Sequence, residues 1–170
     1  MRTTTEKFRL VYTFDAPKEL VFNAFADADA LNEWWGPAET DNSVISLDFT
    51  PGGIFHFKMD YNGHISYGRF LFRQIQPHDL LEYTNAFCNE HAQVIPAPFD
   101  VKLPLEILYR MEFTEANGKT KITMTGEPVN ASREEEEGFS AINESMQQGF
   151  AGTFDKLVKY LAKTYRGIDS

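Results

Sequence analysis

The side chains in this sequence most able to do chemistry are aromatic, thioether and amide groups that recur at every second position. Phe55, Phe57 and Met59 alternate with polar residues, and the segment 80–87 repeats the alternation with Asn85 as its odd polar member. A mostly apolar surface with a few hydroxyl and amide groups is typical of sites for planar or amphipathic small molecules. The sequence therefore predicts ligand-binding residues at Trp35, Phe55, Phe57, Met59, Tyr83, Asn85, Phe87, Tyr109, Met111, Met146, Phe150 and Phe154.

The same residues would form a solid core if they packed without a gap, because buried aromatic rings commonly do nothing else. Three features favour a cavity instead: glycines expected opposite Phe57 and Tyr109 leave space, methionines adapt to irregular shapes, and buried Tyr or Asn groups need partners. The adjacent Trp34 and Trp35 are typical of an anchor between helix and sheet. Of these two, only Trp35 is expected to reach the cavity.

Metal ligands and nucleophiles have little support in the sequence. His56 and His64 fall on or near one hairpin but lack a third ligand at metal spacing, and the expected register turns His56 towards water. Cys88 has no obvious His partner and is expected to be a buried, inert thiol. We therefore expect no metal and no other cofactor.

An enzymatic alternative uses the same cavity. Tyr83, Tyr109 or a nearby carboxylate would act as acid or base in a cyclase or hydrolase, which requires a shifted pKa and a group aimed at the reacting atom. The sequence contains no Gly-x-Ser-x-Gly motif, phosphate loop or dinucleotide fingerprint. We assign no catalytic residue, and a non-enzymatic binding domain is the first hypothesis.

The amino-acid composition limits which binding partners and which cellular location we expect. The 170 residues suit a single domain spanning 1–170 with a core of about 8–165. Twenty-five acidic against 16 basic residues give a net charge of −9 without a basic stripe, which argues against nucleic acid. Cys88 alone forms no internal disulfide, residues 1–7 lack the apolar stretch of a secretory signal, and no apolar run approaches the ~18 residues of a membrane span. A cytoplasmic protein is expected.

Periodicity predicts the elements that position these residues. Alternation over 8–14 predicts a strand, and apolar spacing predicts two short helices, one around Leu20 to Phe25 and one from Ala30 to Trp35. The C-terminal third predicts one long helix able to cover a sheet. Its apolar stripe recurs every three or four residues, at Phe139, Ile142, Met146, Phe150, Phe154, Leu157, Leu161 and Tyr165.

Two Asn-Gly pairs fix the register of the strands between these helices. Turns at Asn62–Gly63 and Asn117–Gly118 place Phe57 opposite Gly68 and Tyr109 opposite Gly126, and give each hairpin one apolar face. The segment therefore predicts an antiparallel sheet of about six or seven strands. Residues 88–104 contain three prolines and are expected to form a long loop.

Five segments of this chain form a familiar series of motifs: 14–22, 31–37, 52–57, 79–84 and 119–125. In the order and content of these segments the chain resembles the bacterial domains named after the activator of Hsp90 ATPase, within the START-like (Bet v 1-like, SRPBCC) superfamily. The resemblance implies an α+β helix-grip fold, a curved antiparallel sheet around a long C-terminal helix with a cavity between them.

The chain departs from that family at the expected cavity mouth. Gly149–Phe150 stands where the family usually has Gly-Trp, and the stretches 88–104 and 130–148 look longer than in typical members. The family name alone suggests a third hypothesis, a co-factor of Hsp90-type chaperones. The sequence also leaves open a homodimer and the role of 88–104 as a lid.

Overall fold

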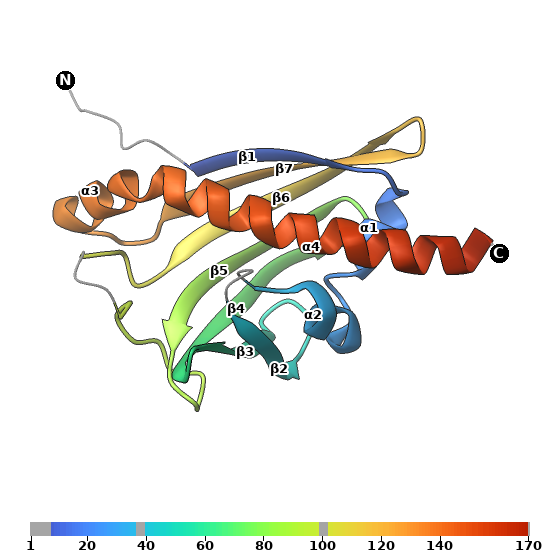
Figure 1. Cartoon of the computed structure of the whole chain (residues 1–170). Coiled ribbons are helices and arrows are strands. Elements are labelled where there is room, and N and C mark those ends of the chain that lie inside the picture. Colours follow the sequence, from blue (N-terminus) through green and yellow to red (C-terminus); the bar gives the residue numbers. More distant parts are fainter. Residues whose placement is uncertain (1–7, 37–39, 99–101, 170) are drawn as a thin grey trace, which may run out of the picture.

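The computed structural model describes residues 8–36, 40–98 and 102–169, with side chains as far as Thr164. The segment 1–7, in which no secretory signal is expected, lies outside the described residues. Figure 1 shows a broad, curved sheet crossed by one long helix, with two short helices beside it. This is the α+β helix-grip fold that the family resemblance implies.

The sheet has seven antiparallel strands in the order β1-β7-β6-β5-β4-β3-β2. Every neighbouring pair except β1–β7 is consecutive in the chain, so short turns build most of the sheet. The strands are β1 (Phe8–Phe14), β2 (Asp41–Leu47), β3 (Ile54–Tyr61), β4 (His64–Gln76), β5 (Leu80–Cys88), β6 (Ile107–Ala116) and β7 (Lys119–Pro128).

The hairpin registers are those that the Asn-Gly pairs predict. Phe57 pairs with Gly68 across β3–β4, and Tyr109 pairs with Gly126 across β6–β7. Asn62 has a φ of 51° and Asn117 a φ of 55°, and the following glycines are also at positive φ. Turns of this kind match the twist of the flanking strands, which is why they hold the register.

Two short helices follow the first strand, as expected: α1 (Lys18–Asn23) and α2 (Ala28–Trp34). The side chain of Asp27 caps α2 by accepting a hydrogen bond of 3.0 Å from the backbone N–H of Asp29. None of the described helices is long and apolar enough to cross a bilayer.

The C-terminal third forms two helices instead of the single predicted one: α3 (Arg133–Ala141) and α4 (Asn143–Asp169). A capping box between Ser132 and Glu135 starts α3, and Ile142 leaves helical geometry between the two helices. The apolar stripe continues across this one-residue break, so periodicity alone does not reveal it.

The core fills the space between the sheet, the short helices and the second half of the α4 stripe. Phe154, Leu157 and Leu161 are at most 4% exposed and face the sheet. On the sheet, the ring of Tyr83 stacks on that of Phe70 with 3.9 Å between centroids. The part of α4 that follows Thr153 is thus buried in the core, and Phe150 before it packs edge-on against Phe8 and Tyr109 of the sheet.

The loop that joins β5 to β6 corresponds to the predicted loop 88–104. Its first residues, 89–92, fold back over the outer face of the sheet, where Asn89 O lies 3.2 Å from His56 Nε2 and Ala92 O accepts a hydrogen bond of 3.0 Å from Arg69 Nη1. His56 is only 4% exposed as a result. The prediction that His56 faces water is wrong, because a distant part of the chain covers it.

Candidate functional site

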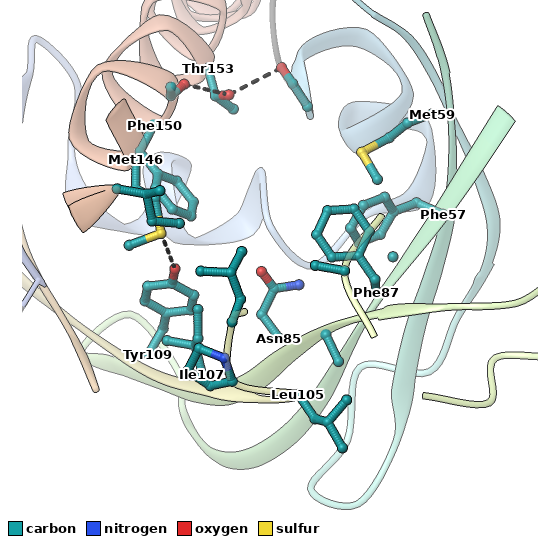
Figure 2. Close-up of a pocket in the computed structure, with 18 of the residues that line it drawn as sticks. Phe57, Met59, Asn85, Phe87, Leu105, Ile107, Tyr109, Met146, Phe150 and Thr153 are labelled. Atoms are coloured by element: carbon teal, nitrogen blue, oxygen red, sulfur yellow. Dashed lines mark hydrogen bonds between the residues drawn. The ribbon is translucent and has the colours of Figure 1, made fainter. Parts of the chain in front are cut away.

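A cavity of about 280 Å³ lies between the inner face of strands β3 to β6 and the first half of α4. The segment at the end of α2 closes one side, and Ile142, between α3 and α4, closes another. Ala97 and the segment 103–105 of the β5–β6 loop complete the wall. Figure 2 shows aromatic rings and methionines facing one another across this space.

Eight of the twelve predicted residues line this cavity. They come from the end of α2, from three strands and from α4, so residues more than 100 positions apart in the chain meet around one space. They are Trp35, Phe57, Met59, Asn85, Phe87, Tyr109, Met146 and Phe150.

The other four predicted residues do not line the cavity; they lie in the core. Phe55, Tyr83, Met111 and Phe154 are each 1% exposed. The hydroxyl of Tyr83 donates to the Met111 sulfur over 3.7 Å, so these two groups bond to each other within the core. Alternation correctly places these side chains on the inner face, but it does not tell where along the strands the helix closes onto the sheet.

The sequence did not predict every residue that lines the cavity. Ile107 lies two positions before Tyr109 on the same strand face, so alternation was a sufficient signal for it. Leu103 and Leu105 belong to a proline-containing loop, where no period indicates which side chain turns inward. Thr153 and Gly36 are cavity residues because α4 and the end of α2 meet, which the sequence does not show.

The glycines opposite Phe57 and Tyr109 do not leave empty space. A Cβ at Gly68 would lie 2.5 Å from Cζ of Phe57, and one at Gly126 would lie 2.6 Å from Cε1 of Tyr109. The rings therefore lie directly against the glycine backbone, and the expectation of vacant space there is corrected. Of the two glycines, Gly68 lines the cavity beside the ring of Phe57 and Gly126 does not line it.

Trp35 reaches the cavity and Trp34 does not. Trp34 is fully buried, and its indole N–H donates to the carbonyl oxygen of Ala24 over 3.0 Å. The ring of Trp35 packs edge-on against Phe57 and Phe70, with centroids 5.4 and 5.0 Å apart. Its Nε1 has no hydrogen-bond partner among the described residues, but the atom is fully enclosed.

The next residue, Gly36, joins this corner to α4. The Thr153 hydroxyl, 3.1 Å away, and the Lys156 ammonium, 2.9 Å away, both donate to the carbonyl oxygen of Gly36. Gly36 has a φ of 95°, a conformation that favours glycine. Trp35 is thereby held at the cavity wall by contacts from the helix.

Asn85 and Tyr109 bring polar groups to the cavity (Figure 2). Asn85 Nδ2 donates to the carbonyl oxygen of Arg69 over 3.1 Å, and the side chain points into the space. The hydroxyl of Tyr109 donates to the Met146 sulfur over 3.9 Å. Burial raises the pKa of the Tyr109 hydroxyl well above its ordinary value, so it stays protonated near neutral pH.

A family model for the activator of Hsp90 ATPase homolog 1-like proteins matches residues 15–162. The chain belongs to this AHSA1-like family. Among curated proteins, none matches the sequence closely enough to count as a relative.

Solved structures of similar proteins agree with the fold of this AHSA1-like chain. A protein from Arthrobacter aurescens is 24% identical, with a TM-score of 0.76 over 94% of this chain and 87% of that one. A Mycobacterium smegmatis protein is 20% identical, with a TM-score of 0.74 over 94% and 93%. The AHSA1 protein of Silicibacter pomeroyi is 18% identical, with a TM-score of 0.68 over 94% and 99%.

The described cavity wall of this AHSA1-like chain contains no Asp, Glu, Lys, Arg, His or Cys. Nowhere in residues 8–36, 40–98 and 102–164 do three His, Cys, Asp or Glu side chains gather where they could hold a metal ion. Cys88 is buried outside this cavity, and burial raises the pKa of its thiol to about 11. The cavity thus offers apolar contact and a few neutral hydrogen-bonding groups.

Proposed function

We propose that this AHSA1-like chain binds a small hydrophobic or amphipathic molecule in the cavity between the sheet and α4, without transforming it. The observation that carries the proposal is the cavity itself: about 280 Å³ of space walled by aromatic rings, methionines and aliphatic side chains. Ligand pockets usually range from about 300 to 1,000 Å³ and are largely apolar with a few polar groups. The volume suits a ligand of up to three aromatic rings.

The chemistry of the wall supports binding over catalysis. A general acid or base works best when its pKa lies near the operating pH. Tyr109 is the titratable residue of the described wall, and burial moves its pKa further from neutrality. Tyr83, the other tyrosine considered for catalysis, lies in the core with its hydroxyl on Met111.

The two glycines of α4 allow a matched test of the proposal. Gly149 lines the cavity and Gly152 does not, and a Cβ at either position meets nothing within 4 Å. Replacing either by leucine raises helix propensity by a similar amount, about 0.5 to 1 kcal/mol. Gly149→Leu therefore obstructs the cavity without weakening the helix, and Gly152→Leu is its control.

The probe is N-phenyl-1-naphthylamine, an uncharged dye whose fluorescence rises in apolar sites. We expect the wild-type chain and Gly152→Leu to bind it equally, and Gly149→Leu to bind it at least tenfold more weakly. Native mass spectrometry of freshly purified protein would then identify a resident ligand. Absence of dye binding, or equal binding by both variants, would contradict the proposal.

Faster ATP hydrolysis by an Hsp90-type chaperone, with no dye binding, would favour the activity that the family description names.

A further inference from the structure

Asn85 is the polar side chain at the centre of the cavity. Figure 2 shows its carboxamide pointing into the space, with Tyr109 and Met146 on one side and Phe57 and Phe87 on the other. The side chain is half-buried and lines the wall of the cavity. It is therefore the group a ligand meets between two apolar surfaces.

The hydrogen bond from Asn85 to Arg69 determines which atom of the Asn85 amide can bind a ligand. Because Nδ2 donates to the Arg69 carbonyl oxygen over 3.1 Å, the amide nitrogen is directed towards β4. The oxygen Oδ1 has no hydrogen-bond partner among the described residues. A carboxamide oxygen accepts and does not donate, so its complement on a ligand is a hydroxyl or an N–H.

Neither hydroxyl of the wall has a proton left for a ligand, and the unpaired Nε1 of Trp35 is fully enclosed. The hydroxyl of Thr153 bonds to the carbonyl oxygens of Gly36 and Gly149, each at 3.1 Å, and that of Tyr109 donates to Met146. An apolar ligand that displaces water from Asn85 Oδ1 leaves this acceptor unsatisfied, which costs affinity. A ligand with one suitably placed donor avoids that loss.

The composition of the wall also limits the charge of the ligand. No acidic, basic or histidine side chain lies on its described part. A charged group buried here would lose its hydration without gaining an opposite charge, and such burial is strongly unfavourable. We infer that the cavity selects an uncharged ligand whose single hydrogen-bond donor, a hydroxyl or an N–H, bonds to Oδ1 of Asn85. This inference rests on the binding function proposed above.

Three naphthalenes of similar size test the inference in the wild-type protein by isothermal titration calorimetry at pH 7. They are 2-naphthol, which has a neutral donor, 2-methoxynaphthalene, which has none, and 2-naphthoate, which is charged. We expect 2-naphthol to bind about fivefold more tightly than the methyl ether, because one ordinary hydrogen bond changes a dissociation constant by about that factor. We expect it to bind at least about tenfold more tightly than the carboxylate, because of the unpaired buried charge.

The variant Asn85→Leu tests whether Asn85 causes the tighter binding of 2-naphthol. It should bind 2-naphthol and 2-methoxynaphthalene equally, while Gly152→Leu keeps the wild-type ratio. Equal binding of all three probes by the wild-type protein, with Gly149→Leu blocking them, would overturn the inference and leave the binding function standing. Failure of every probe and of N-phenyl-1-naphthylamine would overturn the binding function itself. The wild-type comparison remains decisive even if Asn85→Leu does not fold.

Discussion

The hydroxyl of Thr153 on α4 donates to the carbonyl oxygen of Gly36 over 3.1 Å. The two residues are 117 positions apart in the sequence, and their bond is buried where α4 passes the end of α2. It joins the helix that forms one wall of the cavity to the corner that carries Trp35. The shape of the cavity thus depends on a polar contact between α4 and the end of α2.

Replacing Thr153 by valine should lower the free energy of unfolding by about 1 to 2 kcal/mol. Valine has nearly the same shape as threonine, so the change removes a hydrogen bond without opening a cavity. Urea unfolding followed by circular dichroism measures the loss. Thr164→Val is the control, because the hydroxyl of Thr164 bonds only within its own helix, to carbonyl oxygens of residues 160 and 161. Equal losses in both variants would show that the link to Gly36 contributes nothing of its own.

Gly68→Ala and Gly152→Ala should change stability in opposite directions. The Cβ at Gly68 would meet the buried ring of Phe57 at 2.5 Å, and forcing a core ring to move typically costs about 1 to 3 kcal/mol. The Cβ at Gly152 meets nothing, so the alanine there should stabilise α4 by roughly 0.5 to 1 kcal/mol. Thermal and urea unfolding would measure both changes. A neutral Gly68→Ala would mean that the Phe57 ring does not lie against the glycine.

Cys88 should react slowly with a thiol reagent in the folded protein. Burial raises the pKa of its thiol to about 11, so below that pH the reactive thiolate is a small fraction that grows about tenfold per pH unit. At pH 8 we expect modification by a disulfide reagent to be at least roughly 100-fold slower than in urea-unfolded protein. The rate should rise with pH towards 11. Rapid, pH-independent labelling of the native protein would contradict the buried position of Cys88.

Much of the sheet could be predicted because its information is local. The Asn62–Gly63 turn sets the pairing of Phe57 with Gly68 through backbone angles that a two-residue hairpin requires. Alternation then assigns each strand residue to a face, because a slip of one residue would turn every side chain over. Such signals reach only across a turn or along a single strand.

The position of the cavity could not be read in the same way. Tyr83 and Asn85 share one strand and one face, yet Tyr83 is enclosed in the core and Asn85 reaches the cavity. The difference arises because Tyr83 is enclosed by other core side chains, with its ring stacked on Phe70 and its hydroxyl bonded to Met111, whereas Asn85 borders the open space. His56 shows the same limit on the outer face, where a loop 33 residues away covers a side chain that alternation assigns to water.

The antiparallel sheet, the hairpin registers and the residue types available for a site are readable from the amino-acid sequence, because short-range hydrogen bonding and hydrophobic period encode them. The order of motifs indicates the family. Which apolar residues surround a space and which fill it follows from the packing of the folded chain. The packing depends on where elements distant in the chain contact one another, as α4 contacts the end of α2 through the hydrogen bond from Thr153 to Gly36. No local sequence pattern specifies such a contact.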